Sequence, residues 1–416
     1  MKKVLVIGSG GREHAIVTQL YRSSQVEKLF CAPGNAGIAQ MAECVAIADT
    51  DVEQLLQFAQ TQQINLCVVG PEAALVAGVT DAFREAGIPV FGHTQAATQI
   101  EASKEFAKEL MVRYNIPTAA YRSFSDYEAA IAYVRSRNVY PAVLKYDGLA
   151  AGKGVVIAQD EQEAEHALRN MLVGEAFGKG KVVIEDYLEG PEFSFMAFVD
   201  HHRVYPMPLS QDHKRAYDGD KGPNTGGMGA YTPLPFISAV EEQWALEHIL
   251  QPVADAMVAE GKPLTGVLYG GLMKTADGIK VIEFNARFGD PETEVVLPLL
   301  ETDAYTVFHA IATGEPLEAI RWRREATVGV VMASRGYPGT HTKGAEITGL
   351  ENFDGQVLHM GTKRTEGRLV TNGGRVLMCI AHGDTIPQAQ QKVYSEIEKI
   401  HCSNLFYRTD IAHWAL

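Results

Sequence analysis

The sequence predicts an α/β protein built from about three domains. At 416 residues the chain is too long for one ordinary core, because domains usually hold roughly 100–200 residues. In residues 1–100, short apolar runs alternate with amphipathic stretches, which is typical of a doubly wound α/β domain. Apolar runs further along the chain indicate a small α+β unit and then an antiparallel sheet with long helices.

Five short strands are expected in the N-terminal domain, residues 1–101. They are predicted at residues 4–7, 28–32, 45–47, 66–69 and 89–91. A linking helix over residues 104–114 should end before Ile116-Pro117, because a proline disfavours helical backbone in the residue before it. This helix opens a central region, residues 102–325, which includes a small unit at roughly residues 120–190 that is able to move as a lid.

The rest of the chain is expected to hold longer strands. In the lid we predict strands at residues 142–145, 154–158 and 182–185 and a helix at 161–172. An antiparallel sheet is expected from strands 193–199, 267–273 and 279–284, with helices at 240–260 and 303–313. The C-terminal domain, residues 326–416, returns to short strands at 328–332 and 376–380 and ends in a helix around 387–400.

Composition and charge exclude several classes of protein. The balance of 46% apolar and 21% charged residues is that of a folded globular chain. A net charge of −14 argues against nucleic acid as a partner, since backbone binders carry basic stripes, but it leaves anionic small molecules open. The five cysteines show no CxxC spacing, which indicates a reducing cytoplasm with neither disulfides nor a zinc site. The first apolar run is too short for a signal or a membrane span.

Glu283 and Asn285 are the metal ligands that the sequence predicts. They end an apolar strand, and because side chains alternate along a strand, both point to one face while Phe284 points into the core. Mg²⁺ is usually held by one or two such oxygen ligands together with phosphates and water. An edge strand with a solvated polar face is the alternative. With Arg287 close by, this strand predicts a magnesium and phosphate site.

A glycine-rich turn at residues 8–14 follows the first strand and opens a helix. Exposed N–H groups and the helix dipole favour an anion there, so we predict a phosphate at Gly10, Gly11 and Arg12. A nicotinamide site is the competitor. Its fingerprint needs a third glycine where this chain has Glu13, and an acid about 20 residues further on that this chain lacks.

Two loops follow predicted strands, one with Asn35 and one with Pro71-Glu72. In open α/β sheets ligands bind outside the carboxyl ends of the strands, where these loops are expected. Ordinary turn chemistry is the alternative, and it explains the proline well. We interpret Asn35 and Glu72 as candidate ligand-binding residues.

The segment 145–154 has glycines and lysines like a P-loop but fails that pattern. Gly148 and Gly152 are one residue too close together, and the Ser or Thr that should follow the P-loop lysine is missing. We interpret the segment as a hairpin turn that can lie over phosphates, with Lys145 and Lys153 supplying positive charge. A solvated pair of lysines is the alternative.

Two further polar segments are candidates for ligand contact. The first is a strand that ends in Glu185 and then turns, so its backbone can face an adenine edge while Glu192 can take ribose hydroxyls. The second comprises residues 212–215 and 222–231, which are rich in polar side chains and glycine. So many glycines make sense where the chain approaches a ligand closely, and a disordered loop is the alternative.

These motifs together resemble the phosphoribosylamine–glycine ligases, also called glycinamide ribonucleotide synthetases, of the ATP-grasp superfamily. The match covers essentially the whole chain and rests on residues 8–14, 33–35, 70–72, 147–154, 210–215, 222–231, 283–292 and 371–375. It implies an α/β protein with an N-terminal doubly wound (Rossmann-like) domain for phosphoribosylamine, an ATP-grasp fold with a small α+β lid, and a C-terminal β-rich α+β domain. Two features depart from relatives: Tyr146 stands where the family often has alanine, and strand 267–273 lacks a second metal acid.

The resemblance also implies an activity, which is the ATP-dependent ligation of glycine to 5-phosphoribosylamine. The products would be glycinamide ribonucleotide, ADP and phosphate, formed through a glycyl phosphate in purine biosynthesis. It implies one or two Mg²⁺ or Mn²⁺ ions, ATP as co-substrate, small-molecule partners, a cytoplasmic location and a monomer. Another ATP-grasp carboxylate–amine ligase or carboxylase is the alternative. A noncatalytic nucleotide sensor is disfavoured, because neither a metal ligand nor a phosphate lysine is missing.

The family's functional residues carry over to this chain as expectations. The metal ligands are Glu283 and Asn285. The catalytic residues are Arg287, Lys153 and Asp212. The ATP-binding residues are Lys104, Lys145, Gly152, Lys153, Glu185, Leu188 and Glu192. The substrate-binding residues are Gly10, Gly11, Arg12, Glu13, Asn35, Pro71, Glu72, Asp212, Lys214, Asn224, Thr225, Gly226, Arg287, Gly289 and Asp290.

Overall fold

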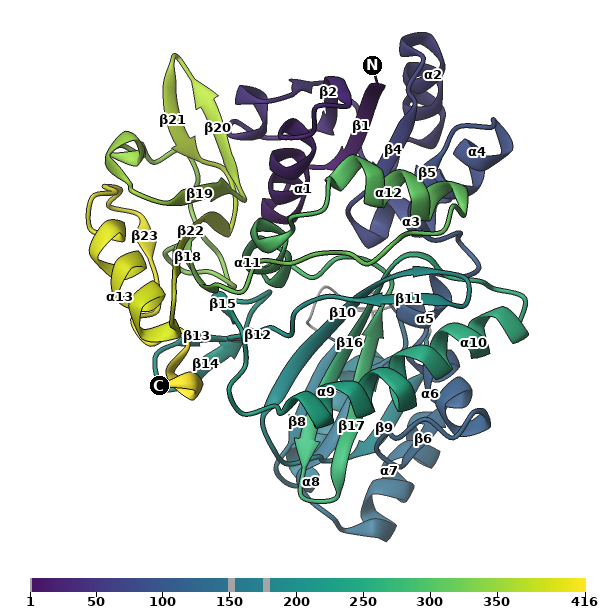
Figure 1. Cartoon of the computed structure of the whole chain (residues 1–416). Coiled ribbons are helices and arrows are strands. Elements are labelled where there is room, and N and C mark those ends of the chain that lie inside the picture. The colour runs from purple at the N-terminus through teal and green to yellow at the C-terminus, as the bar shows by residue number, and fades with distance from the viewer. Residues whose placement is uncertain (1, 149–153, 175–179) are drawn as a thin grey trace.

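The computed structural model describes residues 2–148, 154–174 and 180–416 (Figure 1). Its N-terminal domain is a parallel five-stranded sheet in the order β3-β2-β1-β4-β5 with helices on both faces, as the sequence predicts. The strands are β1 (Lys2–Gly8), β2 (Val26–Pro33), β3 (Glu43–Cys44), β4 (Leu66–Val69) and β5 (Val90–Phe91). The helices are α1 (Gly11–Tyr21), η1 (Ile38–Gln40), α2 (Val52–Gln62), α3 (Glu72–Ala77) and α4 (Val79–Glu85).

One predicted strand of this domain is wrong. The strand expected at residues 45–47 lies instead at β3, where Phe30 pairs with Glu43. Val45 still donates its N–H to Cys31, at 2.8 Å, but the chain then leaves the sheet. The side chains of Val45 and Ile47 pack half-buried against the core without forming a ladder.

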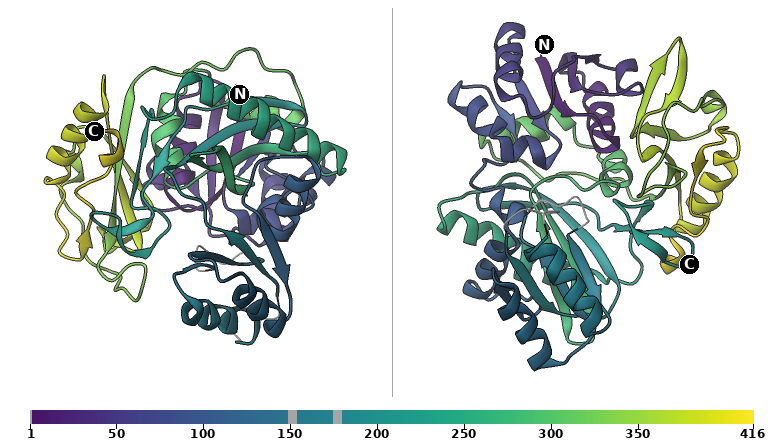
Figure 2. Two further views of the ribbon diagram at one scale, coloured as in Figure 1. Left: turned by 90° about the horizontal axis from the view of Figure 1, so that it is seen from below. Right: turned by 180° about the vertical axis from the view of Figure 1, so that it is seen from behind.

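The lid is a small unit that projects from the rest of the molecule in the left view of Figure 2. Two helices, α5 (Gln99–Ala102) and α6 (Lys104–Arg113), lead into it. Its antiparallel sheet has the order β6-β9-β7-β8 and its own hydrophobic core. The elements are β6 (Tyr121–Phe124), α7 (Tyr127–Arg137), β7 (Ala142–Tyr146), β8 (Val155–Ala158), α8 (Glu161–Leu172) and β9 (Val182–Asp186).

A second antiparallel sheet, β11-β10-β16-β17, lies between the lid and the N-terminal domain. Its strands are β10 (Glu192–Asp200), β11 (Arg203–Pro206), β16 (Thr265–Thr275) and β17 (Gly278–Asn285). The nearby helices are α9 (Ala239–Ala245), η2 (Leu246–Leu250), α10 (Gln251–Ala259), α11 (Glu292–Val296), η3 (Leu297–Leu299) and α12 (Ala304–Thr313). The helix predicted at 240–260 is interrupted by a π-helical turn just before Pro252, whose nitrogen cannot donate a helical hydrogen bond.

The C-terminal sheet takes two of its six strands from the middle of the chain. Its order is β12-β15-β18-β22-β19, with β23 also paired to β18. The strands are β12 (Gln211–Asp212), β15 (Gly229–Thr232), β18 (Ala326–Ser334), β19 (Gln356–His359), β22 (Arg375–Gly383) and β23 (Leu405–Phe406). Two hairpins complete this part: β13 (Arg215–Tyr217) with β14 (Lys221–Asn224), and β20 (Thr362–Thr365) with β21 (Arg368–Thr371). Its helices are η4 (Leu350–Asn352), α13 (Ile386–Ile397) and η5 (His413–Ala415).

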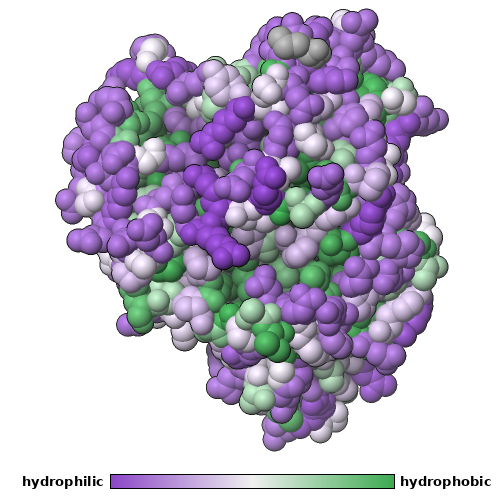
Figure 3. Space-filling model, viewed as in Figure 1, coloured by the Kyte–Doolittle hydropathy of each residue, from purple (hydrophilic) through white to green (hydrophobic). Residues whose placement is uncertain are grey.

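Hydrophilic residues dominate the face seen in Figure 3, and apolar residues show in patches, several of them near the middle of the view. Among residues 2–148, 154–174 and 180–416, no helix is long and apolar enough to cross a membrane. The carboxyl ends of β1, β2 and β4 meet the end of β17 and helix α11 where the N-terminal, central and C-terminal sheets come together. Among the predicted site residues, Arg12, Glu72 and Glu283 lie at this junction, and Lys145 and Glu185 lie on the lid sheet beside it.

Candidate functional site

Glu283 and Asn285 lie on β17 as predicted, two residues apart. Glu283 pairs with Gly271 of β16, and a side chain at Gly271 would come within 3.2 Å of the Glu283 Cγ atom. The glycine therefore leaves room for the carboxylate above the sheet. The described residues place no hydrogen-bond partner on that carboxylate, and the Asn285 side-chain oxygen accepts one hydrogen bond, from Arg287 at 3.3 Å.

Positive charges converge on Glu283. Burial raises the pKa of its carboxyl, but the four surrounding cations lower that pKa below its ordinary value: Lys214, Lys145, Lys104 and Arg287. An ionised carboxylate and an amide oxygen are hard ligands, which fit a divalent cation held partly by phosphates and water. Within the described residues, no group of three or more His, Cys, Asp or Glu side chains could hold a metal ion, so any metal here depends on few protein ligands.

Lys145 of β7 is fully buried and shares one carboxylate with a second lysine. Its Nζ atom lies 3.0 Å from Glu185 Oε1 on β9 and donates to the Ile282 carbonyl at 3.0 Å. Lys108 of α6 lies 3.0 Å from the other oxygen, Glu185 Oε2. Burial is the largest influence on Lys108 and lowers its pKa to about 8. The two lysines thus fix the Glu185 side chain, and adenine contact by the segment that leaves β9 stays a prediction.

The turn after β7 docks on the start of α6. Lys104 donates to the Gly148 carbonyl at 2.9 Å, and the Asp147 carboxylate accepts from the Ser103 hydroxyl at 3.3 Å and the Glu105 N–H at 3.2 Å. Gly152 and Lys153, which the sequence predicts to cover phosphates, lie outside the described residues.

Tyr146, the position that departs from the family, packs against two glycines. A side chain at Gly180 would meet the Tyr146 ring at 2.5 Å, and one at Gly148 would meet it at 3.0 Å. The ring therefore lies beside Gly148, at the start of the turn that is predicted to cover phosphates.

Leu188 and Glu192 flank the turn between β9 and β10. Gly190 in this turn has a φ of +148°, and a side chain there would lie 2.0 Å from the Lys274 carbonyl oxygen, so only glycine fits. Leu188 is half-buried. Glu192 accepts from Lys214 at 2.7 Å, which links the predicted ribose residue to the predicted substrate loop.

Arg287, at the end of β17, joins three parts of the site. Its guanidinium lies 3.2 Å from Glu72 at the start of α3 and 3.1 Å from Glu101 of α5, besides its contact with Asn285. Burial lowers the Arg287 pKa, but Glu101 and Glu72 raise it above its ordinary value, so the side chain stays charged. Pro71 precedes Glu72 as the last residue before α3.

Carboxylates surround the N-terminus of α1, where the sequence predicts a phosphate. The Gly10 N–H donates to the Glu13 side chain of the same helix at 2.7 Å, and Arg12 contacts that side chain at 2.5 Å. Side chains at Gly10 and Gly11 would meet Asp290 at 3.4 Å and Glu294 at 2.5 Å. Phosphate binding at this helix end stays a prediction, and a bound phosphate would have to displace or share these partners.

Asp290 and Glu294 form a buried acid pair beside this helix. Burial and the neighbouring Asp290 raise the Glu294 pKa well above its ordinary value. Burial raises the Asp290 pKa as well, but Arg375 and Arg12 lower it below its ordinary value. The two carboxyls of this pair are therefore shifted in opposite directions, with the proton held more tightly on Glu294 than on Asp290. Gly289 is also crowded, since a side chain there would lie 2.5 Å from Glu292.

The side chain of Asn35 forms its hydrogen bonds with backbone groups of the protein itself. Its amide nitrogen donates to the carbonyls of Ser9 and His359, both at 2.8 Å, and its amide oxygen accepts from the N–H groups of Gly37 and Ile38 at 2.9 and 3.0 Å. These bonds tie the N-terminal sheet to β19 of the C-terminal sheet. Substrate contact by Asn35 stays a prediction.

Asp212 and Lys214 precede the β13–β14 hairpin, Asn224 is its last residue, and Thr225 and Gly226 follow it. Burial is the main influence on Asp212 and raises its pKa to about 7. The Thr225 N–H and hydroxyl donate to the Lys214 carbonyl at 2.7 and 2.8 Å, which holds the two ends of this loop together. Asn224 is exposed. The Gly226 carbonyl accepts from Arg375 at 2.8 Å.

Four residues that sequence reasoning did not assign also contribute to the site: Lys108, Glu101, Glu294 and Arg375. Lys108 follows Lys104 by one helical turn, so helical spacing was an available signal. Arg375 belongs to the motif at 371–375 and contacts Asp290 at 3.0 Å, but no role was attached to it. Glu101 and Glu294 gain their positions from tertiary packing, and the sequence carries no local signal for them.

The parallel N-terminal sheet, the antiparallel lid and the central sheet carrying Glu283 define a protein of the ATP-grasp class. Family models for phosphoribosylglycinamide synthetase match nearly the whole chain. The N domain matches residues 2–101, the ATP-grasp (A) domain residues 102–293 and the C domain residues 327–414. The chain belongs to the phosphoribosylglycinamide synthetase family.

Individual relatives agree with this assignment. Phosphoribosylamine–glycine ligases from Halalkalibacterium halodurans and Listeria innocua are each 52% identical to this chain, covering 99% and 98% of it and 97% and 98% of their own lengths. The crystal structure of phosphoribosylamine–glycine ligase from Thermotoga maritima is 33% identical with a TM-score of 0.87, covering 99% of this chain and 100% of that one. A biotin carboxylase domain from Hydrogenobacter thermophilus shares the fold alone, at 18% identity, a TM-score of 0.73 and 98% and 91% coverage.

Proposed function

We propose that this chain is an ATP-dependent ligase that joins glycine to 5-phosphoribosylamine, giving glycinamide ribonucleotide, ADP and phosphate in purine biosynthesis. The observation that carries the proposal is the group of cations around Glu283 and Asn285: Lys145 donates to the Ile282 carbonyl beside Glu283, and Arg287 donates to the Asn285 side chain. Lys214 and Lys104 lower the Glu283 pKa together with these two. Such a site suits a triphosphate and a metal ion. The relatives named phosphoribosylamine–glycine ligase support the choice of substrates.

A carboxylate is a poor electrophile, so the glycine carboxyl must first be activated. In the proposed first step a glycine carboxylate oxygen attacks the γ-phosphorus of ATP, and ADP leaves. In this proposal Lys145 and Arg287, which both lower the Glu283 pKa, stabilise the charge on the transferring oxygens. One or two Mg²⁺ or Mn²⁺ ions held by Glu283 and Asn285 would neutralise phosphate charge when bound.

In the second step the amine nitrogen of phosphoribosylamine attacks the acyl carbon of glycyl phosphate, and phosphate leaves. The nitrogen must lose a proton. We assign this proton to Asp212, because a base is most effective when its pKa lies near the working pH, and the Asp212 pKa is raised to about 7. The lid sheet and the turn after β7 would exclude water from the acyl phosphate.

We further propose that the enzyme acts as a cytoplasmic monomer with small molecules as its only partners. All five cysteines are free thiols, which suits a reducing compartment. Size-exclusion chromatography with light scattering of the purified chain tests the monomer, and a dimeric mass would reject it.

ADP release by the purified chain tests the reaction. We expect release only when ATP, glycine, freshly generated phosphoribosylamine and Mg²⁺ or Mn²⁺ are all present. Omitting each in turn should abolish it. ADP release that is independent of phosphoribosylamine, or supported by bicarbonate in place of glycine, would reject this substrate assignment.

A further inference from the structure

A hairpin interrupts the loop that carries the predicted substrate residues. We call residues 212–226 the substrate loop: Asp212 and Lys214 precede β13, and Thr225 and Gly226 follow β14. All four residues of β14 are exposed. A two-stranded hairpin is marginally stable by itself, so something outside the hairpin must hold it.

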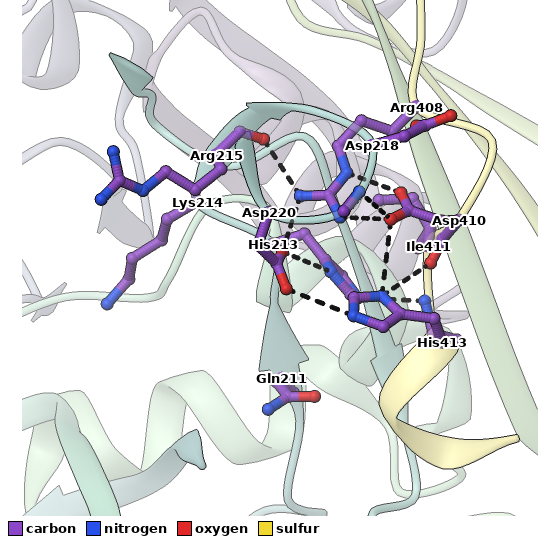
Figure 4. A network of polar contacts seen from close by, with 12 residues as sticks. Gln211, His213, Lys214, Arg215, Asp218, Asp220, Arg408, Asp410, Ile411 and His413 are labelled. Carbon is purple, nitrogen blue, oxygen red and sulfur yellow. Dashed lines mark hydrogen bonds and ion pairs between the residues drawn. The ribbon is translucent and has the colours of Figure 1, made fainter. Parts of the chain in front are cut away.

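Arg408, close to the C-terminus, binds the turn of this hairpin through polar contacts (Figure 4). Its side chain is fully buried, and its Nε and one terminal nitrogen each donate to Asp410 at 2.8 Å. The other terminal nitrogen lies 3.0 Å from Asp220 Oδ1 and donates to the Arg215 carbonyl at 3.1 Å. One guanidinium therefore binds its own segment and both sides of the hairpin turn.

The segment from Arg408 to His413, which we call the C-terminal clasp, contacts every residue of that turn. Asp218 accepts from the Thr409 N–H at 2.8 Å. The Gly219 N–H donates to Asp410 at 2.8 Å. Asp220 lies 3.2 Å from His413 Nε2, and its backbone φ of 53° is uncommon for a residue with a side chain.

The clasp also reaches the substrate loop through His213, which lies between Asp212 and Lys214. The Ala412 N–H donates to His213 Nε2 at 3.0 Å, so neutral His213 carries its proton on Nδ1, the nitrogen that faces Asp220. The backbone of His213 is fixed as well: its N–H donates to Gly229 at 2.9 Å and its carbonyl accepts from Met228 at 2.7 Å.

We propose that Arg408 is a positioning residue for the second substrate, holding the substrate loop so that Asp212 and Lys214 face phosphoribosylamine. The inference rests on the proposed function for the identity of that substrate. Arg408 contacts neither Asp212 nor Lys214 directly; it acts through the hairpin turn and through Asp220, which also faces His213. Lysine cannot reproduce this action, because it lacks the planar fork that reaches Asp410, Asp220 and the Arg215 carbonyl together.

Steady-state kinetics of Arg408→Lys test the proposal. We expect the KM for phosphoribosylamine to rise about ten-fold, which corresponds to roughly 1.4 kcal/mol of binding free energy, with the KM for ATP within about two-fold of wild type. The matched control is Tyr394→Phe. The Tyr394 hydroxyl donates to the Arg408 carbonyl at 2.7 Å and accepts from the Ile411 N–H at 3.0 Å, so it ties the clasp to α13 and not to the hairpin. The control should lower stability but leave both KM values unchanged.

A second variant covers the case in which Arg408→Lys fails to fold. Asp218 is exposed, and Asp218→Ala removes its contacts to Thr409 without leaving a charge buried. It should raise the KM for phosphoribosylamine about three-fold, since one of several anchors is lost. Unchanged KM values in both Arg408→Lys and Asp218→Ala, or equal changes for ATP and phosphoribosylamine, would overturn the proposal.

Hydrogen exchange separates this inference from the proposed function. Without any substrate, the Thr225 and Met228 amides should exchange faster in Arg408→Lys and at the wild-type rate in Tyr394→Phe, because those amides bond to Lys214 and His213. Unaltered exchange in Arg408→Lys would overturn the positioning role even in an active enzyme. A wild-type chain that shows no phosphoribosylamine-dependent ADP release would instead reject the proposed function.

Discussion

Arg287 and Glu101 form an ion pair of 3.1 Å that joins the end of β17 to the helix leading into the lid. Glu101 also accepts from the Ala286 N–H at 2.7 Å. Burial raises the Glu101 pKa, and Arg287 offsets part of that shift. The guanidinium is therefore fixed before any substrate binds, which is what electrostatic stabilisation of a transition state requires.

Arg287→Lys should lower turnover by on the order of 10²-fold to 10³-fold, because lysine keeps the charge but cannot contact Glu72 and Glu101 with one planar group. The measurement is kcat with all three substrates saturating. Arg113→Lys is the control, since Arg113 forms an exposed ion pair with Glu260 on the surface. Equal kcat values for Arg287→Lys and wild type would exclude a catalytic role.

Glu283→Gln should lower turnover by on the order of 10³-fold, because it removes the charged ligand proposed for the metal ion. The fold should persist, since glutamine has the same shape. Binding of Mn²⁺ in the presence of ATP, followed by electron paramagnetic resonance, should weaken in parallel. Asp277→Asn, in the exposed turn of the same hairpin, should change neither quantity. Normal Mn²⁺ affinity in Glu283→Gln would reject the metal assignment.

Asp212→Asn should stabilise the protein more at pH 8 than at pH 5. The native pKa of about 7 lies above the ordinary 3.8, so between these values the native state binds more protons than the unfolded state. As the pH rises from about 4 to about 7, wild type therefore loses stability relative to a variant whose residue 212 cannot titrate. The difference in unfolding free energy between Asp212→Asn and wild type should grow by only roughly 1–2 kcal/mol over this range, because partial exposure and Lys214 reduce the cost of the buried charge.

Urea unfolding at several pH values measures this difference. Asp277→Asn again serves as the exposed control, and its stability difference from wild type should not depend on pH. A pH-independent difference for Asp212→Asn would mean that Asp212 is charged throughout, which would also remove it as the proposed base.

Asn35→Ala should destabilise the protein by about 1–3 kcal/mol. The change leaves the N–H groups of Gly37 and Ile38 and the His359 carbonyl without partners, and unpaired buried groups cost about this much. Asn170→Ala, on the exposed face of the lid helix, is the control. A raised KM with unchanged thermal stability would instead favour substrate contact by Asn35.

Much of the fold could be predicted because its signals are local. The bounds of β4 and α8 agree with prediction to the residue, since an uninterrupted apolar run marks one and strong helical periodicity marks the other. The strands β12 and β15 were missed, because they are short, rich in glycine and polar residues, and formed only by pairing across the molecule, as between Tyr231 and Val328.

The site residues also fall into two groups: those that a local sequence pattern predicts, and those that only tertiary packing brings together. Glu283 and Asn285 were accessible because the alternation of a strand places them on one face. The lysine pair around Glu185 and the acid pair of Asp290 and Glu294 depend on burial, which no spacing in the sequence reports. The clasp could not be predicted for a further reason: 187 residues lie between Asp220 and Arg408 in the sequence, and no motif marks either residue.

The sharing of one sheet between residues 211–232 and 326–406 bears on where this chain can be divided. A cut in the connection between residues 313 and 326 would give two fragments, each with an unsatisfied sheet edge that only the other can fill. The pieces would be poor autonomous modules but good complementation partners. Gene fusions that preserve activity should therefore add sequence at the ends of the chain. A reporter that works by fragment reassembly should be split just before β18.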